Sequence, residues 1–143
     1  GVTPPMHVVS RVVDDAGAAE PLSSPQTRRV LDEEVAKTLG RMMIGTTEFG
    51  TARRSFRDKD GKPVLRGISV AGKTGTLTRR DGKYLLYSWF VGFAPAQHPK
   101  IAFAVLLGNG DSRYVRAHQV AKDLLHGYFR GGAGEGRDLL AKR

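Results

Sequence analysis

The amino-acid sequence predicts an α+β fold: an antiparallel β-meander covered by a helix from the N-terminal half of the chain and by a C-terminal helix. Two observations lead to this prediction. Three strand-like segments, residues 68–77, 84–93 and 101–107, follow one another with connections too short for a crossover helix. Apolar residues recur with helical spacing before and after them, over residues 35–43 and 117–128. The strands are therefore expected to pair as a meander, with a helix supplied from each side.

The composition is that of one globular domain with a modest core. The chain has 143 residues, of which 40% are hydrophobic. No apolar run approaches the ~18 residues that a membrane span needs. The absence of cysteine excludes disulfides, a cysteine nucleophile and thiolate metal sites. We expect neither a metal nor another cofactor.

Basic residues outnumber acidic ones. Lys plus Arg number 23 and Asp plus Glu 14, which gives a formal net charge of +9 and favours anionic partners in general. These residues stand in scattered pairs such as Arg28-Arg29 and Arg53-Arg54, without a long run interleaved with aromatic residues. A solvated basic surface explains this distribution better than nucleic-acid binding does, so no nucleic-acid partner is expected.

Two elements are predicted before the meander. Residues 6–13 are rich in valine and predict a short strand, which a turn at residues 14–17 ends; residues 21–27 are typical of a loop. A helix then starts with Asp32 as its N-cap and two glutamates in its first turn, where the helix dipole favours acidic side chains. Gly45 is expected to end this helix. Its apolar face is formed by Val35, Leu39, Met42 and Met43.

The meander begins after a polar, glycine-containing segment. Residues 46–66 predict a loop, with a short strand at residues 52–56. Residues 68–77 alternate between two faces with the period of a strand. Asp81-Gly82 is a hairpin signal that connects the first strand to the second, and residues 95–99 make the next turn. The third strand is largely apolar, which predicts that it is buried.

A final helix is predicted after the third strand. Asp111 or Ser112 can cap it. Its apolar stripe consists of Ala117, Val120, Ala121, Leu124, Leu125 and Tyr128. Four glycines within residues 131–136 follow, so residues 131–143 are expected to be a flexible tail and residues 1–130 the folded part.

Residues 67–74 match the phosphate-loop pattern G-x-x-x-x-G-K-[ST] letter for letter. That loop requires a buried strand before the first glycine and a helix that begins at the lysine. Here the preceding residues are polar and turn-like, while Gly75 and two threonines follow Lys73, so both requirements fail. Nucleotide binding is therefore kept only as a minor alternative.

As a strand, the same residues suit a different ligand. Lys73 places a cation beside the hydroxyl groups of Thr74 and Thr76, and Gly75 removes a side chain that would keep a ligand away from the backbone. Such a strand edge can accept an extended peptide, and the cation and hydroxyls suit its terminal carboxylate. Thr74 and Thr76 share a face while Lys73 points the other way. One ligand therefore meets all three only from the open edge of the strand.

Lys73-Thr74-Gly75 resembles the third motif of the penicillin-binding proteins and serine β-lactamases. The flanking residues 50–52, 88–95 and 99–102 also look like those of transpeptidase domains. The Phe-Ala-Pro ending at residues 93–95 resembles the class B branch. The resemblance runs from about residue 5 to residue 129. It implies that residues 1–130 are the C-terminal portion of a transpeptidase domain, with part of that family's α/β sandwich.

The resemblance also implies roles for individual residues. Lys73 would support the electrostatics of the site and hydrogen-bond the serine of the family's second motif. Thr74 and Thr76, with Gly75 between them, would bind the carboxylate of a stem peptide or a β-lactam. The backbone N–H of Thr76 would form half of the oxyanion hole.

The family's nucleophile motif, Ser-x-x-Lys, does not occur in this sequence. No serine is followed by lysine at the third position or by asparagine at the second, so Ser-x-Asn is missing as well; the serines are Ser10, Ser23, Ser24, Ser55, Ser69, Ser88 and Ser112. Acyl transfer needs a serine held against a base. This segment alone is therefore expected not to acylate, and its nucleophile would come from an upstream part of the domain that the chain does not include.

The other polar and aromatic residues have ordinary explanations. A serine triad built on a histidine is conceivable, but no serine–histidine pair stands out, and surface or packing roles are the default; the histidines are His7, His98, His118 and His126. Trp89 and Phe90 alternate across their strand, so one of them is expected in the core and the other against a covering element.

The resemblance finally implies a setting and partners. The expected partners are D-Ala-D-Ala stem peptides, β-lactams and the upstream part of the domain, at the outer face of the inner membrane or in the periplasm, with the anchor outside this segment. Without the upstream strands one sheet edge stays unpaired, so self-association or marginal folding is expected. A noncatalytic peptide-binding module, or a basic nucleotide or nucleic-acid binder, remains an alternative.

Overall fold

The computed structural model describes residues 1–3, 5, 9, 11–20, 26–79, 85–110 and 114–130. It divides into two compact units, Gly1–Leu39 and Gly40–Arg143, and each is described by itself. Several sequence predictions concern residues outside this described set: half of the strand at 6–13, the loop at 21–25, Asp81-Gly82, the cap at Asp111 or Ser112, and the tail at 131–143.

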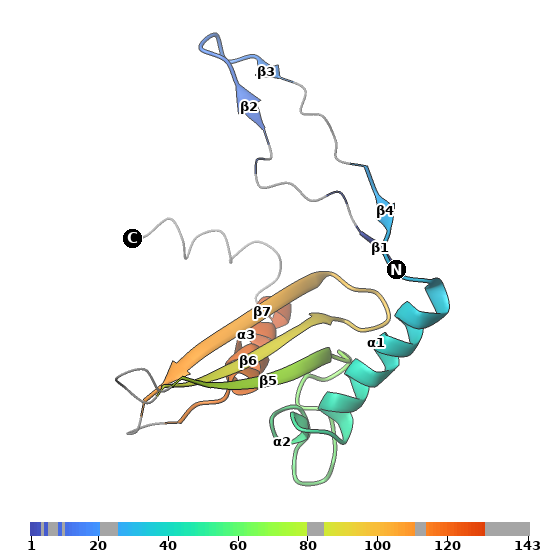
Figure 1. Ribbon diagram of the computed structural model, residues 1–143, viewed down its shortest axis with the longest axis vertical. Helices are drawn as coiled ribbons and strands as arrows, with labels where there is room; N and C mark the ends of the chain where they lie inside the picture. The colour runs from blue at the N-terminus through green and yellow to red at the C-terminus, as the bar shows by residue number, and fades with distance from the viewer. Residues whose placement is uncertain are drawn as a thin grey trace. The chain divides into compact units, whose positions relative to one another are not determined.

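The first unit contains two short antiparallel ladders (Figure 1). β1 (Val2–Thr3) pairs with β4 (Arg28–Arg29), and β2 (Val12–Val13) pairs with β3 (Ala19–Glu20). The turn predicted at residues 14–17 is confirmed, because the Asp14 carboxylate accepts the N–H groups of Ala16 and Ala18 at 3.0 and 2.7 Å. This side chain replaces the backbone acceptors that a tight turn leaves out.

The helix α1 spans Glu33–Glu48, so the prediction that Gly45 ends it is wrong. Gly45 is buried inside the helix, where a Cβ would lie 2.8 Å from the Phe49 ring. Gly45 has no positive φ, so it does not make the left-handed turn that often ends a helix. The Gly45 carbonyl accepts the N–H groups of Phe49 and Gly50, and this pair of bonds closes the helix.

Most of the predicted apolar face of α1 is exposed, and only Met43 is half-buried. Val35, Leu39 and Met42 are exposed, with Met42 at 69%. Within the second unit, the helix is tied to the sheet through its last turn, where the buried Thr47 hydroxyl donates to the Val70 carbonyl at 2.7 Å. Periodicity identified the helix but could not show which surface meets its apolar side.

The strand predicted at residues 52–56 is instead the helical turn α2 (Arg53–Phe56). Ala52 and Phe56, four residues apart, are both buried, which is helical rather than strand spacing. The Arg57 N–H closes the turn on the Arg53 carbonyl at 2.8 Å.

The second unit is built on a three-stranded antiparallel sheet in the order β5-β6-β7, which confirms the predicted meander (Figure 1). The strands are β5 (Ala71–Arg79), β6 (Leu85–Ala94) and β7 (Ile101–Asn109). Thr74 lies opposite Phe90, and Phe90 lies opposite Val105, so these three residues mark one face of the sheet.

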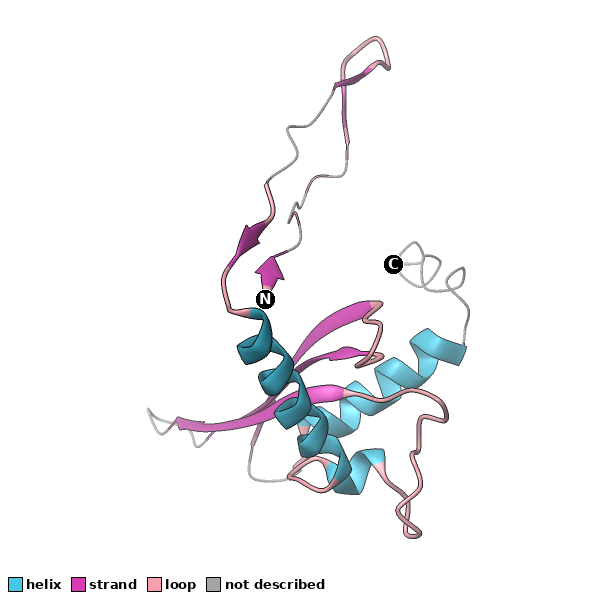
Figure 2. Cartoon of the chain, turned by 90° about the vertical axis from the view of Figure 1, so that its right-hand side faces the viewer, coloured by secondary structure: helices cyan, strands magenta, loops and turns pink. Residues whose placement is uncertain are grey.

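The helix α3 (Ala117–Arg130) packs on that face (Figure 2). Ala117, Ala121 and Leu125 of the predicted stripe are buried, while Leu124 and Tyr128 are exposed. The Ala117 N–H donates to the Ser88 hydroxyl of β6 at 2.9 Å, so the sheet itself satisfies a free amide at the start of the helix.

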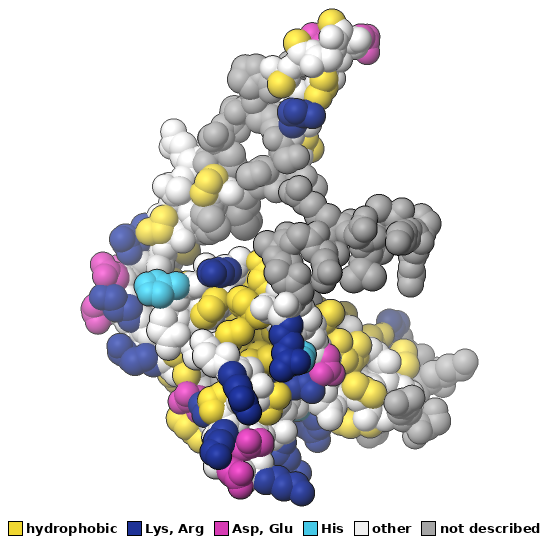
Figure 3. All heavy atoms as spheres, turned by 180° about the vertical axis from the view of Figure 1, so that it is seen from behind, with side chains coloured by type: hydrophobic (Ala, Val, Ile, Leu, Met, Phe, Trp, Pro, Cys, Tyr) yellow, Lys and Arg dark blue, Asp and Glu magenta, His cyan; other side chains and the backbone are white. Residues whose placement is uncertain are grey.

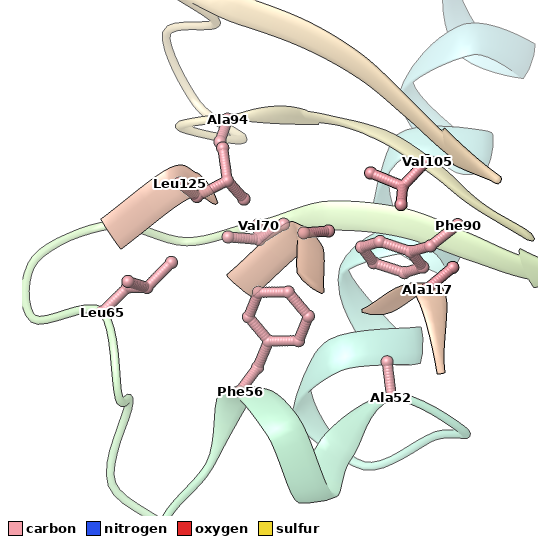
Figure 4. Close-up of a cluster of buried hydrophobic side chains, with 10 residues drawn as sticks. Ala52, Phe56, Leu65, Val70, Phe90, Ala94, Val105, Ala117 and Leu125 are labelled. Atoms are coloured by element: carbon pink, nitrogen blue, oxygen red, sulfur yellow. The ribbon is translucent and has the colours of Figure 1, made fainter. Parts of the chain in front are cut away.

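The core lies between the sheet, α3 and α2, and it is centred on the fully buried Phe90 (Figure 4). The Phe90 ring centroid lies 5.6 Å from those of Phe56 and Phe103. Trp89, on the opposite face, is 40% exposed. The core position expected for one of the two aromatic residues therefore belongs to Phe90. None of the helices in the described part of the chain is long and apolar enough to cross a membrane.

Candidate functional site at the edge of strand β5

The predicted site residues lie together on β5, an edge strand that pairs only with β6 among the described residues. Lys73, Thr74, Gly75 and Thr76 occupy consecutive positions, opposite Val91, Phe90, Trp89 and Ser88 of β6. Lys73 is the third residue of this strand, and no helix begins there. The local geometry is thus a strand edge rather than a phosphate loop.

The Lys73 side chain turns towards its own strand. Its Nζ donates to the carbonyl of Thr74 at 2.7 Å, and the residue is exposed. A lysine reaches the carbonyl of the next residue readily when that carbonyl points to the open edge, because a carbonyl on the paired side is enclosed by the neighbouring strand. Residues two apart in a strand point their backbone groups in the same direction. This geometry favours a Thr76 N–H that also faces the open edge, beside the ammonium group.

Thr74 contacts a residue that the sequence did not single out for the site. The hydroxyl oxygens of Thr51 and Thr74 lie 2.7 Å apart, although the residues are 23 positions apart in the chain. Thr51 stands in the turn between α1 and α2. The resemblance covered Thr51 as a flanking residue, but no local pattern indicated that its side chain reaches β5.

Glycines allow two close approaches along β5. A Cβ on Gly72 would overlap the Phe90 ring, and a Cβ on Gly75 would lie 3.3 Å from the Cβ of Trp89. Gly72 therefore lets the strand rest directly on the core aromatic residue, immediately before Lys73. Gly75 leaves the backbone open between the two threonines. Thr76 is exposed on the same side of the strand as Thr74.

A serine–histidine pair exists elsewhere in the second unit. The Ser55 hydroxyl of α2 lies 2.8 Å from Nδ1 of His118 on α3. The His118 ring packs edge-on against Phe90, and its Nε2 is buried without a hydrogen-bond partner among the residues that the structure describes. Burial, together with the nearby Arg116, lowers the pKa of His118 below its usual value. A catalytic triad needs a third group that orients the histidine through its other nitrogen, so this pair acts as a link between α2 and α3.

The remaining histidines do not join the site. His98 is exposed in the turn after β6, and His126 is half-buried on α3. His7 lies outside the described residues. Over the described ranges, no three His, Asp or Glu side chains come close enough together to hold a metal ion. Basic side chains in Figure 3 are interspersed with acidic and apolar ones rather than joined in one stripe.

Comparison with known families identifies the class of protein. The family described as "Penicillin binding protein transpeptidase domain" matches residues 1–126. The chain therefore belongs to the penicillin-binding protein transpeptidase domain family. Its three-stranded sheet with helices is the α+β arrangement of the related solved structures.

Individual relatives refine this placement. The chain is 37% identical over 90 residues to peptidoglycan D,D-transpeptidase PbpA of Mycobacterium tuberculosis, which covers 62% of this chain and 16% of the relative. It is 34% identical over 86 residues to stage V sporulation protein D of Bacillus subtilis, covering 57% of this chain and 12% of that protein. The relatives support the class B-like assignment.

Solved structures agree with this result. Penicillin-binding protein A of M. tuberculosis, solved as an imipenem acyl-enzyme complex, superposes with a TM-score of 0.59 and 27% identity over 80% of this chain and 24% of that chain. A peptidoglycan synthetase from Bifidobacterium adolescentis gives the same TM-score of 0.59 at 21% identity over 90% of this chain and 24% of its own, which shows the shared fold. The chain spans about a sixth of the length of the PbpA of M. tuberculosis that it matches.

Proposed function

We propose that this chain forms the substrate-binding and β-lactam-binding wall of a class B-like peptidoglycan D,D-transpeptidase. The observation that supports it best is the open edge of β5. There the ammonium group of Lys73 and the hydroxyl groups of Thr74 and Thr76 lie within four successive residues. An extended peptide can add to this edge through main-chain hydrogen bonds. Its terminal carboxylate then meets a cation and hydroxyl donors.

Each residue has a distinct role in this proposal. Lys73 supplies positive charge and hydrogen-bonds the serine of the second motif. Thr74 and Thr76 hold the carboxylate of the stem peptide or the β-lactam, and Gly75 keeps the backbone accessible between them. The Thr76 N–H stabilises the charge that develops on the carbonyl oxygen in the tetrahedral intermediate.

The complete reaction needs a serine that this chain does not provide. In the proposed reaction, the serine oxygen attacks the carbonyl of the penultimate D-alanine, the terminal D-alanine leaves as the amine, and a second amine then takes the acyl group from the serine. Because no serine here is followed by lysine at the third position, the nucleophile belongs to an upstream part of the domain, which is a necessary partner. Alone, the chain binds but does not acylate.

The proposed location follows from this substrate. Relatives carry the names peptidoglycan D,D-transpeptidase and stage V sporulation protein D. Peptidoglycan stem peptides are cross-linked outside the inner membrane, so the working site faces the periplasm or outer surface, within reach of β-lactam antibiotics.

One pair of assays tests the proposal. Titration with a peptide ending in D-Ala-D-Ala, followed by amide chemical shifts, should perturb Ala71 to Thr78, and Lys73→Ala should weaken the binding. Fluorescent penicillin should give no covalent label on the chain. A peptide that perturbs only residues remote from β5 would refute the assigned edge, and covalent labelling would refute the missing nucleophile.

A noncatalytic peptide-binding module is the second candidate, and the same open edge favours it. The two functions differ in what the carboxylate contributes. A transpeptidase wall should discriminate against a C-terminally amidated or L-Ala-ended peptide, whereas a general strand-addition module accepts extended peptides of many sequences. Equal affinity for the D-Ala-D-Ala peptide and its amide would favour the binding module.

We also propose self-association through β7, the opposite edge of the sheet. A cavity of about 260 Å³ lies beside it, lined by Ile101, Phe103, Val105, Ala121, Leu124, Leu125 and Tyr128. Within the described chain β7 pairs only with β6, so its outer backbone groups and this apolar cavity are both available to a second copy.

A further inference from the structure

Thr51 contacts the proposed carboxylate-binding strand through a single hydroxyl group. Its Oγ1 lies 2.7 Å from the Oγ1 of Thr74, and either atom can be the donor. Thr51 is exposed and Thr74 is half-buried, so both side chains have room to rotate, and crowding alone does not bring their hydroxyl groups together. The contact joins the turn between α1 and α2 to the strand edge.

The backbone around Thr51 is fixed by several hydrogen bonds. The N–H of Ala52 donates to the Thr46 carbonyl at 3.0 Å, and the N–H of Arg53 donates to the Gly50 carbonyl at 3.1 Å. Ala52 is completely buried, and its side chain belongs to the core cluster drawn in Figure 4. One turn earlier, the Thr47 hydroxyl donates to the Val70 carbonyl at 2.7 Å. The turn is thus held by its own backbone bonds and by the buried Ala52, and the Thr47 bond joins the end of α1 to the residue before β5, so the hydroxyl contact is part of a fixed structure.

The proton count of this pair decides what it can do. A threonine hydroxyl has one proton to donate and two lone pairs that accept. If Thr74 donates its proton to a ligand carboxylate, it can only accept in its contact with Thr51, so Thr51 must be the donor. A hydroxyl that accepts one hydrogen bond also becomes a stronger donor, because bonds in a chain polarise one another.

We propose that Thr51 is a positioning residue for Thr74: its hydroxyl donates to Thr74 Oγ1 and so directs the Thr74 proton towards the open edge of β5, where a peptide carboxylate binds. The carboxylate in this statement rests on the proposed function. The hydroxyl contact itself can be tested without any ligand, so the two can fail separately.

The ligand-free test measures the side-chain conformation of Thr74. Three-bond couplings from its Cγ2 methyl carbon to the backbone N and carbonyl carbon report the χ1 rotamer in solution. Thr51→Val keeps the shape of the side chain but removes the hydroxyl, and Thr51→Ser keeps the hydroxyl. A single Thr74 rotamer in the wild-type chain and in Thr51→Ser, with averaged couplings in Thr51→Val, is expected. Unchanged couplings in Thr51→Val would overturn the proposal.

The ligand test measures the affinity for a peptide ending in D-Ala-D-Ala. Thr51→Val should weaken binding about 3- to 10-fold, the usual size of one neutral hydrogen bond. Thr51→Ser should restore most of it. Thr46→Val is a matched control on α1, since the structure records no hydrogen bond from the Thr46 side chain to β5; it should leave the affinity unchanged.

A double-mutant cycle separates positioning from a general structural effect. In a Thr74→Val background the additional change Thr51→Val should have no further effect, because Thr51 acts through the Thr74 hydroxyl. Equal weakening in both backgrounds would overturn the proposal. If the wild-type chain does not bind the peptide at all, the proposed function fails, and the Thr74 couplings still decide the role of Thr51.

Discussion

The two edges of the three-stranded sheet differ in chemistry. The edge at β5 carries an ammonium group and hydroxyls, and α1 and the turn that follows it hold it in place through Thr47 and Thr51. The edge at β7 carries Ala102, Ala104 and Leu106 on its exposed face and borders an apolar cavity on the other. The polar edge suits reversible binding of a ligand, whereas the apolar edge suits a stable contact with another protein segment.

Phe90 connects the two edges, because it lies opposite Thr74 on one side and Val105 on the other. Phe90→Ala should therefore weaken both edges together. Removing a fully buried phenylalanine costs about 3–5 kcal/mol of unfolding free energy, since it leaves a cavity beside Phe56 and Phe103. Urea denaturation measures this loss. A loss below about 1 kcal/mol would show that the core is not centred on this ring.

The β7 edge should lose its self-association when its cavity becomes charged. Leu124 lines the cavity and is 61% exposed, so Leu124→Lys should shift the chain towards the monomer with little change in fold. Burying one leucine at an interface contributes about 1.5–3 kcal/mol, which corresponds to at least a tenfold weaker dimer. Sedimentation velocity over a concentration series measures the shift.

Leu77 provides the matched control for this experiment. It lies on β5 and is 62% exposed, nearly the same fraction as Leu124. Leu77→Lys should leave association unchanged if the apolar edge alone is the contact. A chain that is monomeric at all concentrations before any substitution would contradict the proposed contact itself.

The β5 edge should lose affinity for its ligand when the ammonium group is removed. Lys73→Met keeps the unbranched side chain out to Cε and removes the ammonium group, and we expect about tenfold weaker binding of a D-Ala-D-Ala peptide. This is the low end for a charge-assisted hydrogen bond, because Lys73 is exposed to solvent. The wild-type affinity should also fall with added salt, and that of Lys73→Met should fall less. An equal salt dependence in both proteins would show that Lys73 does not meet the carboxylate.

The contrast between the edges could be predicted only in part from the sequence. Alternation predicted the strand that became β5, and helical spacing predicted the stripe of α3 of which Ala117, Ala121 and Leu125 are buried. Both patterns depend only on residues close in sequence, and both agree with the structure because the apolar residues that they mark pack in the core. The motif Lys73-Thr74-Gly75 predicted from sequence alone which strand carries the polar edge.

Contacts between distant residues could not be predicted in this way. The hydroxyl pair that holds Thr74 spans 23 positions, and the Ser55–His118 pair spans 63. No periodicity relates such residues, since their proximity depends on how α2 turns after α1. For the same reason, the short strand predicted at residues 52–56 is a helical turn in the structure, with the buried Ala52 and Phe56 at its two ends.

The Ser55–His118 link gives the smallest effect, and it acts on the core beneath the β5 edge rather than on the ligand. Burial holds the folded-state pKa of His118 below its usual value of 6.5, so the unfolded chain takes up the proton first. The contribution of His118 to the free energy of unfolding should therefore be constant above about pH 6.5, fall as the pH drops below it, and level off once the folded-state pKa is passed. His118→Gln should remove this component, and His98→Gln, in an exposed turn, should keep it. Urea midpoints at pH 7.5 and 5.5 for the three proteins measure the difference, and the same pH dependence in His118→Gln as in the wild type would assign it to another group.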